Sequence, residues 1–100
     1  IPLVSLGGKG IISVLANALP RPMHDISSLA IAGDFKKALA INNEYFDLME
    51  ACSADVNPIP VKYMMNRMGL ACGPCRMPLT SMTEENNVKV DAVLKKHGLI

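Results

Sequence analysis

Two cysteines separated by two residues form the pattern in this chain that most directly suggests chemistry. Cys72-Gly73-Pro74-Cys75 suits thiol–disulfide exchange when its first thiol lies at a helix N-terminus, where the pKa of a cysteine falls. Such a site needs a strand before the motif, a helix that opens at it and usually a tryptophan. Here a helix is expected to end at Gly69, Pro78 follows closely, and the chain has no tryptophan. The sequence therefore favours an ordered loop over residues 70–80 that carries two incidental thiols.

The cysteines and histidines do not form a pattern typical of a metal site. Zinc requires a second pair of ligands beside Cys72 and Cys75, and only Cys52, His24 and His97 remain, at irregular spacing. Neither histidine has an acidic, serine or cysteine partner at a telling distance along the chain. We therefore expect no metal ligand, and surface or helix-capping roles for both histidines.

Lysine and tyrosine side chains are the other candidate reactive groups. Lys9 lies between glycines, as a phosphate-binding lysine can, but the Walker pattern is absent and no helix follows the glycines. Lys62 lies one turn into a predicted helix, whereas a Schiff-base lysine needs a desolvated pocket, usually at a strand end. We expect solvated or structural roles for both lysines. Tyr45 and Tyr63 fall on apolar helix faces and are expected in the core.

A double glycine followed by apolar, β-branched residues indicates a helix end and then a buried strand. Residues 7–8 close a helix whose last apolar turn begins the chain, and residues 10–15 form the strand. In α/β folds the carboxyl end of such a strand holds the ligand. Ser13, Asn17 and the backbone around Ile12 are therefore candidate ligand contacts. Plain strand packing explains the same residues equally well.

No partner for this strand is recognisable in the rest of the sequence. The other residues read as helices and loops, and the first residue is Ile1 rather than methionine. A hydrophobic content of 50% suffices for a sizeable core. We therefore expect the chain to be the tail of a larger protein, in which the strand finds its neighbours.

Four helices are predicted after the strand from apolar spacing and from end signals. Gly33 ends the first, and Asp34 is placed to cap the second. Ser81 and Glu84 form a capping box for the last, with Thr83 as an alternative cap. The helices cover residues 23–32, residues 35–52, a stretch that begins at Asn57-Pro58-Ile59-Pro60 and stops at Gly69, and residues 84–97.

Composition narrows the classes of partner. A net charge of +1, with acids and bases interspersed, gives no electrostatic footprint for nucleic acid or for an anionic membrane surface. No apolar run is long enough to cross a bilayer, so no membrane span is expected. Three cysteines are too few for a disulfide scaffold and favour a reducing, cytoplasmic location.

Several short segments, taken together, resemble the dihydrodipicolinate synthase family. They occur in the family's order and spacing, and the resemblance covers essentially the whole chain. Residues 57–62 most favour this family over sister pyruvate aldolases such as N-acetylneuraminate lyase. The segments are Gly7-Gly8-Lys9-Gly10-Ile11-Ile12-Ser13-Val14, Ala16-Asn17, Asn57-Pro58-Ile59-Pro60-Val61-Lys62, Met68-Gly69-Leu70, Arg76-Met77-Pro78-Leu79-Thr80 and Gly98-Leu99-Ile100.

The resemblance implies a (β/α)8 barrel followed by a C-terminal helical domain. A barrel takes about 250 residues, so this mostly α-helical chain is expected to supply only a part of one. Residues 1–33 are expected to be the last βα unit, and residues 34–100 the helical domain. Family members condense pyruvate with aspartate β-semialdehyde through a lysine Schiff base, the first committed step of lysine and diaminopimelate biosynthesis. The resemblance further implies a homotetramer without a cofactor.

The resemblance also assigns residue roles. The Schiff-base lysine and the relay tyrosines lie upstream of this chain, so neither Lys9 nor Lys62 is catalytic and the fragment alone is expected to be inactive. Ile12 matches the eighth-strand residue whose backbone lies against bound pyruvate, and it is the one substrate-binding residue expected here. The pair Cys72 and Cys75 departs from the usual family loop. Another Schiff-base pyruvate aldolase, a redox or metal-binding module and a free-standing helical interaction module stay open as alternatives.

Overall fold

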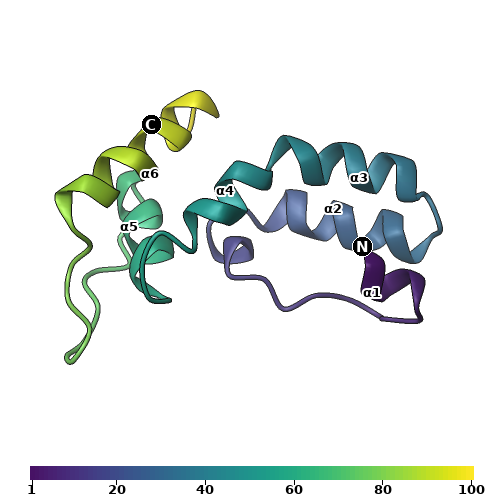
Figure 1. The fold of residues 1–100 in the computed structure, drawn as a ribbon, viewed down its shortest axis with the longest axis horizontal. Coiled ribbons are helices and arrows are strands. Elements are labelled where there is room, and N and C mark those ends of the chain that lie inside the picture. Colours follow the sequence, from purple (N-terminus) through teal and green to yellow (C-terminus); the bar gives the residue numbers. More distant parts are fainter. The chain divides into compact units, whose positions relative to one another are not determined.

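The computed structural model describes residues 1–100, and all of its regular elements are helices (Figure 1). The chain forms two compact units, Ile1–Phe46 and Asp47–Ile100. No helix combines the length and the apolar character that a membrane span requires. The elements are α1 (Pro2–Ser5), the 3-10 helix η1 (Leu15–Asn17), α2 (Pro20–Ile31), α3 (Phe35–Glu44), α4 (Phe46–Ala51), α5 (Ile59–Arg67) and α6 (Glu84–Lys96).

The strand predicted over residues 10–15 is absent, which corrects the sequence-based expectation. Residues 8–13 are irregular, and Leu15 already belongs to η1. A strand exists only when its backbone groups pair with a neighbouring strand. These 100 residues contain no second strand, so the apolar segment has nothing to pair with inside the chain.

The double glycine does end a helix, as predicted. The chain turns sharply after α1, because Gly7 adopts a φ of +102° and the amide of Gly8 donates to the carbonyl of Leu3 at 2.8 Å. A Cβ at Gly8 would lie 2.7 Å from that carbonyl oxygen. Only glycine fits this close approach of backbone to backbone.

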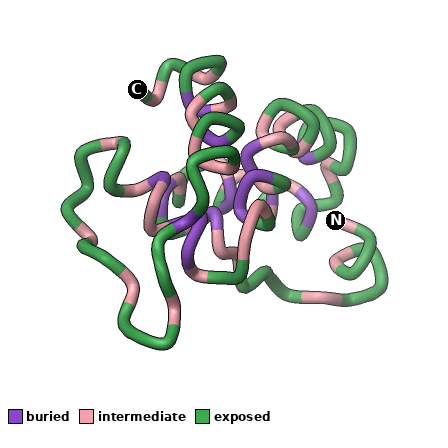
Figure 2. Tube along the Cα trace, turned by 60° about the vertical axis from the view of Figure 1, so that its left-hand side comes forward, coloured by how far each residue is buried: buried purple, intermediate pink, exposed green.

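The first unit is built on the pairing of α2 with α3, which run side by side in Figure 1. Gly33 separates them with a φ of +85°, and the carboxylate of Asp34 accepts a hydrogen bond from the amide of Lys37 at 3.1 Å. Both end signals were predicted, and both are confirmed. The buried residues of this unit, which are among those coloured purple in Figure 2, include Leu15 of η1, three residues of α2 and Ala38 of α3. The three residues of α2 are Met23, Ile26 and Ala30.

The long helix predicted over residues 35–52 is divided into α3 and α4. The break falls at Tyr45, which has φ −103° and ψ 9°. Asn42 and Asn43 precede it, and asparagine side chains compete with the helical backbone for hydrogen bonds. Apolar residues on both sides of the break are nevertheless buried, among them Ala38, Leu48 and Cys52.

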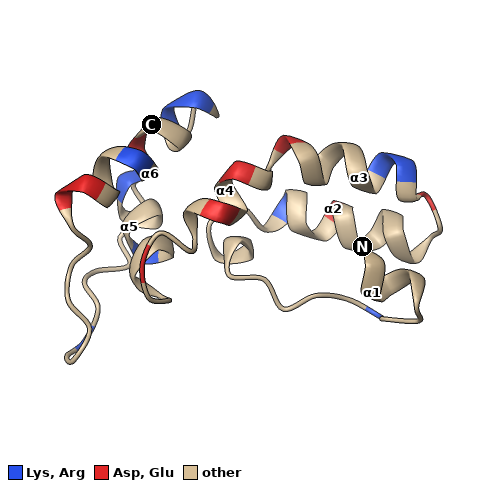
Figure 3. Ribbon diagram, in the orientation of Figure 1, with Lys and Arg blue, Asp and Glu red and all other residues tan.

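The second unit pairs α5 with α6 and closes them with a long loop. α5 begins at Ile59 with Pro60 in its first turn, as the prolines predicted, and the chain leaves it through Gly69. Thr83 caps α6 by accepting from the amide of Asn86, so the alternative cap is confirmed and the Ser81 capping box is wrong. Acidic residues begin α6 and lysines end it, which suits the helix dipole (Figure 3).

The core of the second unit predicts a clear mutational contrast. Leu94 on α6 is completely buried, whereas Val88 on the same helix is 61% exposed. We expect Leu94→Ala to destabilise the folded protein by about 2–5 kcal/mol, because it leaves a cavity. Val88→Ala should change the stability by less than about 0.5 kcal/mol. Thermal or urea unfolding of the purified variants measures both, and equal losses would contradict the assigned core.

Candidate functional site

The first candidate site is the irregular segment that carries Ile12. Two local hydrogen bonds form its downstream end: Ser13 Oγ accepts from the amide of Ala16 at 3.3 Å, and Asn17 Nδ2 donates to the carbonyl of Val14 at 3.0 Å. Both side chains, expected as ligand contacts, are thereby used to start η1. The side chain of Ile12 is fully exposed.

The backbone of this segment is free of partners within the chain. From Lys9 to Ser13 no amide donates and no carbonyl accepts a backbone hydrogen bond. Backbone polar groups that become buried in a protein must be paired. These groups can therefore pair with other strands, or one of them can meet a ligand.

A shallow hollow of about 450 Å³ adjoins the segment within the first unit. One side is formed by residues around Lys9 and Ile11, and the other by α2 with Met23 at its base. His24 lies at its edge with Nε2 3.2 Å from Ser28 Oγ, on an exposed part of α2. No carboxylate lines this hollow, so it lacks the acid that would orient His24 as a general base.

A second hollow, of about 260 Å³, lies within the second unit between α5 and the loop of the two cysteines. Lys62, Asn66 and Cys75 are among its lining residues. The Nζ of Lys62 donates to the carbonyl of Pro74 at 2.6 Å, so this lysine is held by a structural contact. The predicted loop over residues 70–80 is confirmed, and no helix opens at the cysteine motif.

The three cysteines are free thiols, and they do not gather with histidines or acids. No group of three or more His, Cys, Asp or Glu side chains is arranged to hold a metal ion. Cys52, the residue directly after α4, is buried, and burial raises the pKa of its thiol. Cys72 and Cys75 are both half-buried in the loop.

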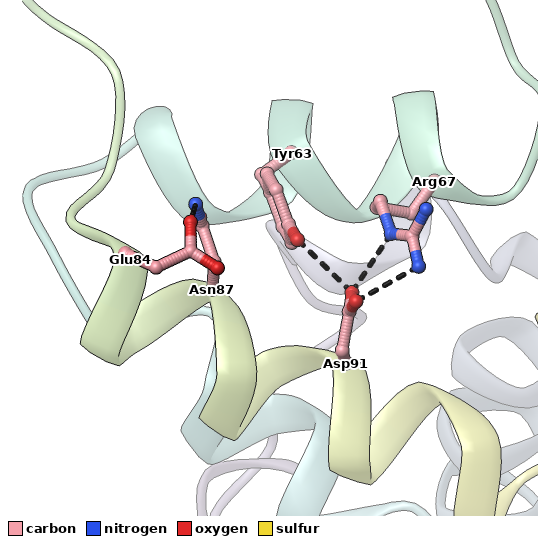
Figure 4. Close-up of polar contacts among 5 residues, drawn as sticks. All are labelled: Tyr63, Arg67, Glu84, Asn87 and Asp91. Atoms are coloured by element: carbon pink, nitrogen blue, oxygen red, sulfur yellow. Dashed lines mark hydrogen bonds and ion pairs between the residues drawn. The ribbon is translucent and has the colours of Figure 1, made fainter.

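One polar cluster links α5 to α6 through a single carboxylate (Figure 4). Asp91 accepts from Arg67 Nε at 2.9 Å and Nη2 at 2.8 Å, and from the hydroxyl of Tyr63 at 3.0 Å. The Arg67 guanidinium holds the pKa of Asp91 below its usual value, while burial, aided by the Asp91 carboxylate, raises the pKa of Tyr63. Tyr63 is therefore a half-buried hydrogen-bond donor and not a core residue enclosed by apolar groups.

A second cluster holds the end of α6 in the same unit. Asp47 lies 2.6 Å from Lys96 Nζ and 2.8 Å from His97 Nε2, and the hydrogen bond from Lys96 is the main cause of its lowered pKa. His97 caps α6, as predicted for a capping histidine. Its pairing with Asp47, 50 positions away, is not signalled by the local sequence.

Neither cluster has the form of an active site. Each carboxylate accepts hydrogen bonds from cationic or hydroxyl groups of its own unit, so its role is to join helices. The function must therefore be sought through the segment around Ile12 and through comparison with known proteins.

A model of the Dihydrodipicolinate synthetase family matches residues 1–97. The chain belongs to this family. The 4-hydroxy-tetrahydrodipicolinate synthase of Methanocaldococcus jannaschii is 45% identical over 100 residues, which are all of this chain and 35% of that protein. The enzyme of the same name from Acetivibrio thermocellus is 43% identical over 100 residues, 34% of its length. The chain thus spans about a third of the length of the curated relatives that it matches.

Solved structures of the family have the same fold over the shared part. A crystal structure of dihydrodipicolinate synthase matches 99% of this chain and 34% of its own, with a TM-score of 0.96 and 45% identity. The chloride-inhibited synthase from Acinetobacter baumannii in complex with pyruvate matches 95% of this chain and 33% of its own, with a TM-score of 0.89 and 38% identity. A monomeric synthase variant matches 98% of this chain and 33% of its own, with a TM-score of 0.89 and 34% identity. These relatives are TIM-barrel enzymes, which confirms the predicted fold class.

The Asp91 cluster predicts how stability depends on pH. The pKa of Asp91 is lowered in the folded protein. Its contact with Arg67 and Tyr63 therefore stabilises the fold at pH values above the ordinary aspartate pKa of about 3.9. This stabilisation is lost as the pH falls through the lowered pKa of Asp91. Arg67 is 43% exposed, so the loss should be only about 1 kcal/mol. Asp91→Asn should lower the melting temperature at neutral pH, and the gap to wild type should begin to narrow below about pH 4 and close at pH values below the lowered pKa of Asp91.

Glu85→Gln is the matched control, because its partner Lys89 is exposed and the pair contributes little. Melting curves between acid and neutral pH give the comparison. A gap between wild type and Asp91→Asn that stays constant at every pH would contradict the assigned cluster.

Proposed function

We propose that these 100 residues are the C-terminal part of a 4-hydroxy-tetrahydrodipicolinate synthase. The observation that carries the proposal is the match of the whole chain, at 45% identity, to a curated enzyme of that name. A crystal structure of a dihydrodipicolinate synthase also matches 99% of the chain with a TM-score of 0.96. The full-length protein would condense pyruvate with aspartate β-semialdehyde. We take it to be a cytoplasmic enzyme, in keeping with three unpaired cysteines.

The proposed reaction uses a lysine that lies outside this chain. Its amine condenses with the ketone of pyruvate and releases water, which gives a Schiff base. Loss of a methyl proton turns the Schiff base into an enamine, whose carbon then attacks the aldehyde of the second substrate. A Schiff-base lysine needs a desolvated site that lowers its pKa.

Neither candidate lysine of this chain has such surroundings. Lys9 is exposed beside Gly10, and Lys62 donates to the carbonyl of Pro74. We therefore propose that the 100 residues have no activity by themselves. Their part in the enzyme is structural, with one exception at residue 12.

That exception is the backbone around Ile12. We propose that residues 1–33 are the last βα unit of the barrel and that the irregular residues 10–13, which precede η1, become its strand when neighbouring strands are present. The unpartnered backbone groups from Lys9 to Ser13 support this, because a buried strand uses them in ladders. The backbone of Ile12 would then lie against bound pyruvate at the carboxyl end of the barrel.

Residues 34–100 are proposed as the helical domain that follows the barrel. The Asp47 cluster holds the C-terminal end of α6, and the Asp91 cluster joins α6 to α5. Neither cluster contributes a reactive group. We further propose a homotetramer as the enzyme's assembly. A monomeric variant exists among the solved relatives, so sedimentation of the full-length protein is the test of that assembly.

A mutation pair at residue 12 tests its role. Because a backbone contact tolerates a shorter β-branched side chain, we expect Ile12→Val to leave the KM for pyruvate within about twofold of wild type. Ile12→Phe should raise that KM by roughly tenfold, since a bulky side chain displaces the backbone that positions the substrate. An Ile12→Phe protein that melts like wild type and keeps its KM would contradict the assignment.

Chemical trapping tests the reaction itself. We expect full-length protein incubated with pyruvate and borohydride to carry one reduced adduct, on a lysine outside this chain, by peptide mass spectrometry. The reaction contains protein, pyruvate and borohydride but no aldehyde substrate. The control contains protein and borohydride without pyruvate. An adduct on Lys9 or Lys62 would overturn the residue assignment, and the absence of any adduct would overturn the proposed function.

A further inference from the structure

The loop of the two cysteines is held by side chains of α5. Asn66 makes three hydrogen bonds to it: its Oδ1 accepts from the amides of Cys72 at 3.1 Å and Gly73 at 3.2 Å, and its Nδ2 donates to the carbonyl of Gly73 at 2.9 Å. Lys62 adds the bond to the carbonyl of Pro74 at 2.6 Å. We call Asn66, Lys62 and these bonds the α5 clamp.

The clamp holds the segment between the thiols in an open form. Residues 71–76 contain neither a turn nor a bend, whereas a disulfide between residues three apart requires their Cα atoms to approach within about 7 Å. The Cys72 thiol also donates to the carbonyl of Lys62 at 3.3 Å. Closing a bridge therefore requires residues 72–75 to leave the clamp and fold back.

The two thiols differ in access. Cys75 lines the hollow beside α5, where an incoming small molecule has room, while Cys72 is turned toward the backbone of α5. Cys52, in contrast, is only 8% exposed, and burial raises the pKa of its thiol. A buried thiol of this kind is inert toward disulfide exchange.

We propose that Cys72 and Cys75 form a reversible disulfide by exchange with a low-molecular-weight disulfide, and that closing it releases the α5 clamp. The Cys75 thiolate attacks one sulfur of glutathione disulfide, whose S–S bond breaks, and one glutathione leaves and takes up a proton. The deprotonated Cys72 then attacks the Cys75 sulfur and expels the second glutathione. Two thiols are oxidised, and one glutathione disulfide is reduced to two glutathiones.

This loop differs from the active site of a thiol–disulfide oxidoreductase. No helix opens at the motif, so the reduced form is stabilised by the clamp and not by a helix N-terminus. Oxidation frees the ammonium of Lys62 and the amide of Asn66 from the loop. The redox state is thereby linked to the shape of the hollow that both residues line.

The test is a redox titration of the full-length protein in glutathione buffers, followed by acid quenching, alkylation with N-ethylmaleimide and tryptic digestion. Cleavage after Arg67 and Arg76 places both loop thiols in peptide 68–76, and Cys52 falls in peptide 38–62. We expect peptide 68–76 to become lighter by two hydrogen atoms and to escape alkylation in oxidising buffer. Dithiothreitol should restore it, and Cys52 should stay a free thiol throughout.

Variants separate the order of attack from the role of the clamp. Cys72→Ser should accumulate a mixed disulfide of glutathione at Cys75, faster than Cys75→Ser does at Cys72. Asn66→Ala and Lys62→Met each remove hydrogen bonds that hold the reduced loop. Each variant should therefore form half of its Cys72–Cys75 disulfide in a less oxidising glutathione buffer than wild type. The glutathione ratio at this midpoint should shift by roughly fivefold for each hydrogen bond lost. Asn43→Ala, on the exposed face of α3, should leave the midpoint unchanged.

Three results would overturn the proposal. Peptide 68–76 could carry two separate glutathiones in place of a bridge, or its thiols could both remain alkylatable in oxidising buffer. In the third, Asn66→Ala or Lys62→Met forms half of its disulfide at the same glutathione ratio as wild type, or only in a more oxidising buffer. The last result would leave the disulfide intact but disprove its link to the clamp.

Discussion

The constraint on which the rest of this chain depends is the set of unpartnered backbone groups from Lys9 to Ser13. Residues 9–12 are exposed in this chain, and such backbone groups must find hydrogen-bond partners if they become buried in a larger protein. Yet α1, η1 and α2 on either side of the segment are regular and end at residues that their sequence explains. We propose that the segment pairs with strands that lie outside these 100 residues. Family membership gives those strands a natural origin, because the matched relatives are TIM-barrel enzymes about three times as long.

The second unit is stabilised by an apolar core and by two aspartate clusters. Its apolar core consists of two or more side chains from each of α4, α5 and α6, such as Leu48, Met64 and Leu94, together with Met82. Two aspartates complete it, because Asp47 fixes the end of α6 and Asp91 fixes its side against α5. Each aspartate receives two or more donors, which lowers its pKa and makes the contact sensitive to acid. In this unit both Asp47 and Asp91 are paired with cationic side chains.

Much of the helical architecture could be predicted, because glycines and prolines mark the ends locally. Gly33, Gly69 and Gly98 follow helices with positive φ, and Pro60 lies in the first turn of α5. The break at Tyr45 escaped prediction because the apolar stripe continues through it. The pairing of His97 with Asp47 and the hold of Asn66 on the cysteine loop also escaped, since they join residues whose closeness depends on the fold. The strand over residues 10–15 has the right pattern, but pairing and not pattern makes a strand.

Amide hydrogen exchange in the full-length protein tests the central claim most directly. The account predicts that the amides of residues 10–13 exchange as slowly as those in the middle of α2, because neighbouring strands accept their hydrogen bonds. The amides of Arg76 and Met77, which donate no hydrogen bond in the loop, give the fast reference. Exchange of residues 10–13 at that fast rate would contradict the claim that this segment is a barrel strand.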